Sequence, residues 1–305
     1  MDFQQCLETV DTILMEGALG ERLKREYHLT FDEHVAMAAL IYTEAGRQAL
    51  TELWQQYMAI AQQYQLPFLA ATPTRRANRE RVRQGGWTDD IIRDNVRFLR
   101  QIQTSSEQLM FVGGLMGCKG DAYTGQGALT ADEAQAFHHW QADLFRQAGV
   151  DFLYAGIMPT LPEAIGMAQA MAETQLPYII SFTITASGRL IDGTPISKAI
   201  AAIDAAVSLP PACYMTNCIH PRIARQALAQ PFNDQPAVHD RFWGIQANTS
   251  PLAYAELDGA AELHATEPVS FAQEIITLRD ACGLHIIGGC CGTDDRHMTE
   301  IAKRL

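Results

Sequence analysis

Three cysteines, Cys218, Cys290 and Cys291, are the residues of this chain best suited to chemistry by type and position. Each ends a short run of β-branched and apolar residues: Cys218 closes CYMTNC, and the adjacent pair closes HIIGGCC. Zinc favours thiolate ligands at about 2.3 Å, and an ion with three protein ligands keeps a fourth tetrahedral position for water or substrate. We therefore expect these thiols to bind one catalytic zinc ion whose open position holds water or a substrate.

Two other kinds of site would use the same thiols. A structural zinc site usually has a fourth ligand and paired CxxC elements. The chain contains no CxxC, and His220, close to Cys218, is the alternative fourth ligand. A redox-active pair of Cys290 and Cys291 is the other alternative, although a disulfide between adjacent residues is strained.

The compartment and the partners are constrained by composition. The chain has seven cysteines, an odd number, and begins MDFQQCLETV, which does not resemble a signal peptide. We expect a reducing, cytoplasmic location, with Cys6, Cys213 and Cys282 as small core residues. The formal net charge is −12 and Lys and Arg form no long run, so nucleic acid and membrane are not expected partners.

Eight short apolar runs are spaced so that a helix fits between each pair, the pattern of parallel βα units. They are Thr12–Gly17, Phe68–Thr72, Met110–Leu115, Phe152–Ile157, Tyr178–Ile184, Cys213–Cys218, Trp243–Asn248 and His285–Cys290. Helix-favouring segments lie between them at Leu40–Tyr64, Ala131–Gly149, Leu161–Thr174 and Ser270–Cys282. We predict an α/β fold, a single (β/α)8 TIM-type barrel domain over residues 1–305; a doubly wound sheet is the alternative.

Such a barrel would bring the three thiols together. The carboxyl ends of all eight strands surround one mouth, where the active sites of these barrels lie. Cys218 ends the sixth run and Cys290 the eighth. Adjacent residues on a regular strand point in opposite directions, but the flanking glycines allow the chain to bend, so both cysteines of the pair can face the mouth. The long segments Gly113–Gly125 and Asn248–Pro268 would border it.

The motif GGCCGT, together with the cysteine of TNCIHP, resembles the zinc- and homocysteine-dependent S-methyltransferase family. The resemblance covers nearly the whole chain in the same order. ILMEGALGERL is similar to the family's opening DGAxGTxL, with Glu16 in place of the aspartate, and ATPT lies where the family has a TNTY-like stretch. GDAYTG is similar to GSEYxG, and SFTITASGRLIDGTP to the SFT…DGTP element. The family fold is a (β/α)8 barrel, in agreement with the count of runs.

The resemblance implies roles for particular residues. The zinc ligands would be Cys218, Cys290 and Cys291, and the substrate-binding residues would include Glu16, Thr72, Thr74 and Asn248. Glu16 would reach a substrate ammonium, or else is a solvated turn residue. The two threonines would donate to a substrate carboxylate, or else cap the next helix. Asn248 matches the asparagine of the family's PNSGE-like stretch.

The chain departs from the family at three points. The glutamate that holds the amino group of homocysteine is replaced by Gly156, and after Asn248 the PNSGE-like pattern gives way to TSPLAYAELDGA. Loss of that carboxylate removes a charge-assisted hydrogen bond to the substrate ammonium. Arg75 and Arg76 are also unlike the family pattern; an extra substrate carboxylate would explain them, and so would an exposed helix start.

The resemblance implies methyl transfer to a thiol, homocysteine or a related compound, as in methionine biosynthesis. The size of the chain favours a small sulfonium or ammonium donor, such as S-methylmethionine, S-adenosylmethionine or betaine. Four aromatic residues are candidates for contact with a cationic donor: Trp87, Tyr123, Trp140 and Trp243. The alternatives are a barrel that binds a thiol or sulfonium compound without turnover, and a methyltransferase with another acceptor because of Gly156. The oligomeric state does not follow from the sequence.

Overall fold

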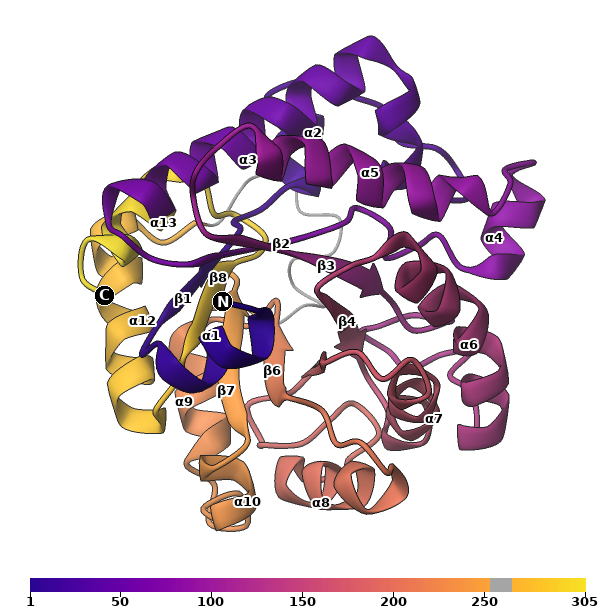
Figure 1. The fold of residues 1–305 in the computed structure, drawn as a ribbon. Helices are drawn as coiled ribbons and strands as arrows, with labels where there is room; N and C mark the ends of the chain where they lie inside the picture. Colours follow the sequence, from indigo (N-terminus) through magenta and orange to yellow (C-terminus); the bar gives the residue numbers. More distant parts are fainter. Residues whose placement is uncertain (253–264) are drawn as a thin grey trace.

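A computed structural model describes residues 1–252 and 265–305 of the chain. Its eight parallel strands form a closed barrel in sequence order, and the last strand pairs with the first (Figure 1). They are β1 (Ile13–Met15), β2 (Phe68–Ala71), β3 (Met110–Met116), β4 (Phe152–Met158), β5 (Tyr178–Phe182), β6 (Cys213–Asn217), β7 (Phe242–Ala247) and β8 (Ile286–Gly289). The predicted (β/α)8 barrel is confirmed, and the doubly wound sheet is excluded because such a sheet is open.

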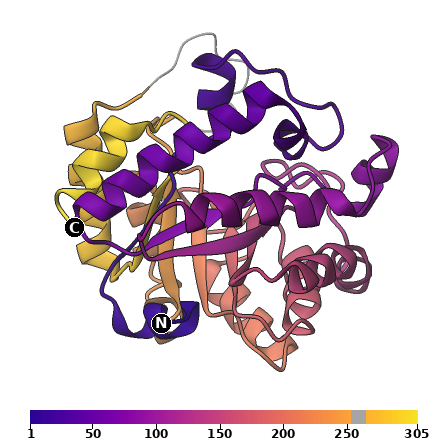
Figure 2. The ribbon, with the colours of Figure 1, turned by 45° about the horizontal axis from the view of Figure 1, so that its top comes forward.

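Helices surround the strands (Figure 1). The helices that the structure describes are α1 (Phe3–Thr9), α2 (Gly20–Arg25), the 3-10 helix η1 (Met37–Tyr42), α3 (Glu44–Gln63), α4 (Arg79–Gln84), α5 (Asp90–Thr104), α6 (Ala131–Ala148), α7 (Leu161–Ala172), α8 (Ile196–Ala206), α9 (Pro221–Leu228), α10 (Pro236–His239), α12 (Pro268–Cys282) and α13 (Asp295–Ala302). Figure 2 shows α3 and α5 lying across the outside of the strands.

The predicted element boundaries differ from the observed ones where side chains end an element. The predicted helix Leu40–Tyr64 is divided, because the Thr43 side chain accepts a hydrogen bond from the Gly46 N–H and thereby caps a new helix. The predicted strand Tyr178–Ile184 ends at Phe182, beyond which Ile184 pairs with Leu190 in an isolated antiparallel bridge. The predicted loop Asn248–Pro268 lies partly outside the described residues, as does the altered sequence after Asn248.

The strands divide their side chains between two cores. Alternate residues face the barrel interior, among them Ile13, Met15, Tyr154 and Met215, while the residues between them pack against the helices. Helix α1 lies at one end of the barrel (Figure 1). Its Phe3 ring stacks on Phe152 with 4.4 Å between centroids. Each such buried aromatic ring contributes roughly 1.5–3 kcal/mol of stability. The opposite end, at the carboxyl termini of the strands, is where a site can be built.

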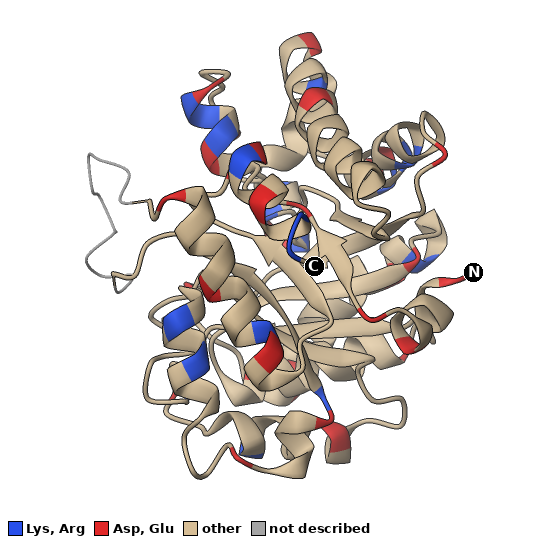
Figure 3. Ribbon diagram, turned by 90° about the vertical axis from the view of Figure 1, so that its left-hand side faces the viewer, with Lys and Arg blue, Asp and Glu red and all other residues tan. Residues whose placement is uncertain are grey.

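Charge is spread over the helical layer. In the view of Figure 3, segments with Lys or Arg are interspersed with segments that carry Asp or Glu.

Within the described ranges, no helix combines the length and the hydropathy that crossing a membrane requires.

Candidate metal centre

The structure brings the three predicted cysteines together. Cys218 directly follows β6, and Cys290 and Cys291 directly follow β8. Their Sγ atoms all lie within 4.8 Å of one another, with 3.5 Å between Cys218 and Cys291 and 4.0 Å between Cys290 and Cys291. Among the described His, Cys, Asp and Glu side chains, these three form the group that could hold a metal ion.

Strand β7 holds the thiol-bearing ends of both neighbouring strands. The Cys218 N–H donates to the Gln246 carbonyl at 2.9 Å, and the Cys290 N–H donates to the Ala247 carbonyl at 2.7 Å. Successive carbonyls of a strand point toward opposite neighbours, so one strand fixes the backbone of both cysteines. The closeness of the thiols is therefore a property of the sheet itself.

A tight turn directs the adjacent cysteines to the same side. The Thr293 N–H donates to the Cys290 carbonyl at 3.1 Å, and Gly292, third residue of this turn, has φ +80. A positive φ at the third position is what a type II turn requires, and glycine adopts it without steric cost. A Cβ at Gly292 would also lie 1.9 Å from Thr249 Oγ1. The last glycine of GGCCGT is thus required by the turn and by its neighbour.

Cys218 is held in an uncommon backbone conformation, with φ +57. Left-handed angles are rare for residues other than glycine and concentrate at functional sites. The turn moves the Cys218 side chain out of the strand pattern at the point where β6 ends. Two separate left-handed turns, at Cys218 and Gly292, therefore shape the thiol cluster.

The spacing of the thiols fits a tetrahedral ion. Zinc–sulfur bonds of about 2.3 Å at tetrahedral angles place two sulfur ligands about 3.8 Å apart. The observed separations of 3.5 and 4.0 Å lie on either side of that value. Hydrogen bonds from Cys290 and Cys291 lower the pKa of the Cys218 thiol, while its contact with Cys218 raises the pKa of Cys290. The three thiols therefore cannot all ionise easily on their own. A bound cation would favour the thiolate form of all three.

The other sulfur and imidazole candidates lie elsewhere. Cys6 and Cys213 are buried and Cys282 is half-buried, in agreement with the expected core positions. His220 precedes α9 and accepts a hydrogen bond from the Arg222 N–H at its Nδ1. It does not belong to the thiol cluster.

Tyr123 reaches the cluster from the loop that joins β3 to α6. Its side chain forms a hydrogen bond with the Cys218 thiol, and burial together with the nearby thiols raises the Tyr123 pKa far above its usual range. The sequence identified Tyr123 only as one of four aromatic candidates. The three tryptophans of that set contact other side chains: Trp87 stacks on Tyr42, Trp140 donates to Asp89, and Trp243 packs against His285.

A buried carboxylate organises the loop that carries Tyr123. Glu163, in the first turn of α7, is fully buried and accepts hydrogen bonds from the Lys119 N–H at 2.7 Å and from the Leu129 N–H at 3.4 Å. The His138 Nε2 atom lies 3.1 Å from the same carboxylate. One side chain thus holds both ends of the loop. Sequence reasoning did not find it, because nothing near Glu163 in the chain marks it as a loop anchor.

Glu16 is built into the barrel wall. Its carboxylate is 4% exposed and accepts hydrogen bonds from Trp54 Nε1 in α3 at 2.8 Å and from the Ala71 N–H at 3.1 Å. The Glu16 backbone carbonyl accepts from the Gly289 N–H of β8. The Ala71 N–H, on the other side, therefore finds its acceptor in the Glu16 side chain and not in a backbone carbonyl. Burial raises the Glu16 pKa to about 8. The solvated-turn alternative is wrong, and contact with a substrate ammonium stays a prediction.

Thr72 and Thr74 are fully buried and extend the pairing of β2 with β3. The Leu115 N–H donates to Thr72 Oγ1 at 3.1 Å, and Thr74 Oγ1 donates to the Leu115 carbonyl at 2.8 Å. Asn248 follows β7, and its N–H donates to the Ile219 carbonyl at 3.0 Å. Its Oδ1 accepts from the Ser250 N–H. All three residues stand at the mouth, and their substrate contacts stay predictions.

A polar network inside the barrel was not predicted. The Tyr154 hydroxyl lies 2.8 Å from both Asn217 Oδ1 and Gln246 Oε1, and Asn217 Nδ2 donates to Gln246 Oε1 at 2.6 Å. Ser181 Oγ also bonds Asn217. Asn217 directly precedes Cys218, so the network supports the thiol cluster from within. Period-two alternation along the predicted strands could have identified these residues as inward-facing.

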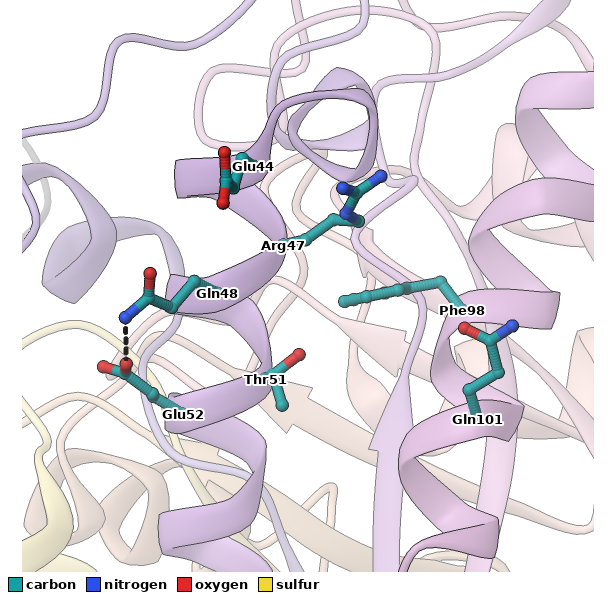
Figure 4. Close-up of a pocket in the computed structure, with 7 residues that line it drawn as sticks. All are labelled: Glu44, Arg47, Gln48, Thr51, Glu52, Phe98 and Gln101. Carbon is teal, nitrogen blue, oxygen red and sulfur yellow. Dashed lines mark hydrogen bonds between the residues drawn. The ribbon is translucent and has the colours of Figure 1, made fainter.

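One hollow on the outer layer is separate from this centre. It measures about 640 Å³, lies open between α3 and α5 and is lined by Glu44, Arg47, Gln48, Thr51, Glu52, Phe98 and Gln101 (Figure 4). It contains no thiol, and Gln48 donates there to Glu52 (Figure 4).

The fold and the site together define a closed (β/α)8 barrel that carries three clustered thiols at the ends of β6 and β8. Residues 13–305 match the family model described as homocysteine S-methyltransferase. The chain belongs to this family and is an S-methyltransferase, which confirms the resemblance seen in the sequence.

Similar solved structures agree in fold. The homocysteine methyltransferase MmuM from Escherichia coli in its oxidised form has a TM-score of 0.76 at 20% identity over 98% of both chains. Its metallated form has a TM-score of 0.74 at 19% identity over 99% of both chains. Its apo form has a TM-score of 0.65 at 19% identity over 98% of both chains.

Proposed function

We propose that Cys218, Cys290 and Cys291 bind one zinc ion and that the enzyme transfers a methyl group to a thiol, homocysteine or a related compound. The observation that carries this proposal is the thiol cluster at the barrel mouth, with its spacing close to that of tetrahedral zinc. Zinc bound there would deprotonate the acceptor thiol and keep it nucleophilic. Family membership supports the reaction class.

The protein's own residues would orient the two substrates. The Tyr154–Asn217–Gln246 network and the β7 carbonyls keep the thiols in place, and much of the rate gain from such a site comes from orientation. Of the four aromatic candidates, Tyr123 is the one that bonds the Cys218 thiol, so its ring is placed to contact a sulfonium or ammonium donor. The donor class proposed is that of S-methylmethionine, S-adenosylmethionine or betaine.

Further parts of the proposal concern the setting of the enzyme. Residues 1–305 act as a single homocysteine S-methyltransferase-like barrel domain, with small molecules as its partners, in methionine biosynthesis. We place the protein in the cytoplasm, because a reducing compartment keeps the cluster in the thiol state that metal binding needs. Glu16, Thr72, Thr74 and Asn248 remain the proposed substrate-binding residues.

Metal analysis and a donor–acceptor screen test the proposal together. Protein purified without chelators should hold one zinc per chain, and a donor from the set should methylate homocysteine or a related thiol. Protein without stoichiometric zinc would refute the metal centre. Zinc-loaded protein that binds thiols but transfers no methyl group from any donor would instead support the non-catalytic binding barrel. A reversible Cys290–Cys291 disulfide, detected by thiol titration, would support the redox alternative.

A further inference from the structure

Within the described strands, the inward-facing residues nearest the barrel mouth carry no charge. The period-two alternation that turns Tyr154 inward continues to the strand ends. In β3 to β8 it selects Leu115, Gly156, Ser181, Asn217, Gln246 and Gly288. A Cβ at Gly156 would lie 3.2 Å from Leu115 Cδ1 and 3.5 Å from the Tyr154 ring, so this position faces the interior and contributes no side chain. A substrate ammonium group would meet no carboxylate in this ring.

Among the residues that the structure describes, three carboxylates near the mouth have protein partners. Glu21 accepts from the Gly292 N–H at 2.5 Å and lies 3.3 Å from the Arg25 guanidinium. Asp121 accepts from two backbone N–H groups of its own loop, at 2.8 and 2.7 Å. The Glu16 carboxylate bonds the barrel wall. A substrate cation bound to Glu16 or Glu21 would compete with these contacts, and Asp121 uses its Oδ1 to hold its own loop.

Arg75 lies at the mouth, between β2 and α4. A Cβ at Gly117 would lie 2.7 Å from Arg75 Cγ, so the arginine stem crosses the residue that follows β3. Gly117 directly follows β3, so the Arg75 stem lies beside the carboxyl end of that strand. The Arg75 stem therefore lies over the edge of the barrel mouth.

The guanidinium of Arg75 is available to a ligand. The side chain is half-buried, and it forms no hydrogen bond or ion pair with any residue that the structure describes. Burial, together with the nearby Arg81 and Arg75, lowers the pKa of the adjacent Arg76. A guanidinium with unused donors in a fixed fork binds carboxylates in a bidentate manner.

Resting on the proposed thiol methyl transfer, we propose that Arg75 binds a carboxylate of the thiol acceptor. The uncharged inward-facing residues at the mouth and an arginine without a partner among the described residues favour an acceptor with an anionic end. An ammonium group on that acceptor would be dispensable. Homocysteine satisfies the first condition, and thiols with a carboxylate but no amine should be accepted as well. Arg75 is thus a specificity-determining residue of this chain.

Three thiols that differ by one group test the inference. Homocysteine carries both an ammonium and a carboxylate group, 4-mercaptobutanoate only the carboxylate, and 3-aminopropane-1-thiol only the amine. Binding is measured on the Co²⁺-loaded protein, from the change in Co²⁺–thiolate absorption, and methyl transfer is measured separately. We expect 4-mercaptobutanoate to bind within about tenfold of homocysteine, and 3-aminopropane-1-thiol at least about tenfold more weakly.

Variants assign the preference to one side chain. Arg75→Ala should weaken binding of both carboxylate thiols by roughly tenfold or more and leave the aminothiol within about twofold. Arg75→Lys should give intermediate affinities, since lysine keeps the charge but not the fork. Arg79→Ala is the matched control, because it removes the same charge from a residue that lines a hollow beside Trp140 on the outer surface. It should change none of the affinities.

Results that would refute the role of Arg75 can be distinguished from results that would refute the proposed reaction. Stronger binding of the aminothiol than of 4-mercaptobutanoate, or equal losses in Arg75→Ala and Arg79→Ala, would refute the role of Arg75. If Arg75→Ala changed only the KM of the methyl donor, Arg75 would bind a carboxylate of the donor. That result would also refute the proposed role of Arg75 in acceptor binding. A carboxylate preference without methyl transfer would leave the inference standing and refute only the proposed reaction. Absence of thiol binding would overturn both.

Discussion

The Sγ atoms of Cys218 and Cys291 lie 3.5 Å apart, although 73 residues separate the two cysteines in the chain. Strand β7 lies between the strands that they follow and fixes the backbone at both strand ends, through the Gln246 and Ala247 carbonyls. Thiolate ligands positioned by backbone hydrogen bonds need little rearrangement to bind an ion. The proposed zinc ligands are therefore held in place by the sheet, and each of them can be tested separately.

Replacing any one of the three cysteines should remove the metal. Cys218→Ser, Cys290→Ser and Cys291→Ser each exchange a thiolate for a hydroxyl that zinc binds poorly, so we expect zinc affinity to fall by roughly 100-fold or more. Metal content after purification without chelators gives the measurement. Cys282→Ser, at a half-buried position outside the cluster, should keep one zinc per chain. Retention of zinc in Cys218→Ser would contradict the assigned ligand set.

Gly292→Ala should distort the turn that aims Cys290 and Cys291. Alanine at φ +80 costs roughly 1–2 kcal/mol, and its Cβ would lie 1.9 Å from Thr249 Oγ1. We expect a lower Tm and a loss of zinc affinity. The double variant with Thr249→Ala removes the overlap but keeps the unfavourable φ, so it should recover part of both losses. A single variant with wild-type Tm and zinc content would show that the turn is not required.

Burial of Glu16 should make the metal-free protein less stable as the pH rises. The Glu16 pKa is raised from 4.5 to about 8 in the folded state, so folding favours its protonated form. Its contribution is fully present below pH 4.5 and is lost as the pH rises through about 8. Tyr57 and Tyr154 are titratable groups that interact with Glu16. Both have raised pKa values, so neither titrates between pH 4.5 and 8.

Glu16→Gln isolates this effect. The amide keeps the shape and one acceptor for Trp54 or Ala71 but cannot ionise. Tm is measured from pH 4.5 to 8 with chelator present, and the difference between Glu16→Gln and wild type should shift in favour of the variant as the pH rises. A difference that stays constant over this range would show that Glu16 is ionised throughout.

Glu163 should control substrate affinity through the loop that carries Tyr123. Glu163→Ala leaves two loop N–H groups and His138 without their buried partner, and removing one member of such a pair costs roughly 3–5 kcal/mol. We expect faster proteolysis within the Lys119–Leu129 loop and a KM increase larger than the kcat decrease. Glu163→Gln keeps one acceptor and should show a smaller change in both measurements. Equal proteolysis rates in all three proteins would argue against the anchor.

The barrel could be predicted because each βα unit is encoded locally. Apolar runs such as Phe152–Ile157 and the helical segments between them set the strand count, and the closed sheet follows from that repetition. The predicted helix and strand boundaries were less accurate, because a single side chain can decide where an element begins or ends. The cap formed by Thr43 and the change of backbone partner at Glu16 both depend on particular hydrogen bonds.

Residue type and position at the ends of predicted strands were sufficient to select Cys218, Cys290 and Cys291, since thiolate chemistry and parallel-strand geometry are general. Contacts between distant segments were not accessible in the same way. The contact of Tyr123 with the thiols, the burial of Glu16 against Trp54 and the position of Arg75 beside Gly117 each depend on where separate segments pack. The sequence by itself determined the barrel and the identity of the thiols, whereas tertiary packing decided their spacing and the charges around them, because both depend on non-local contacts that no local pattern records.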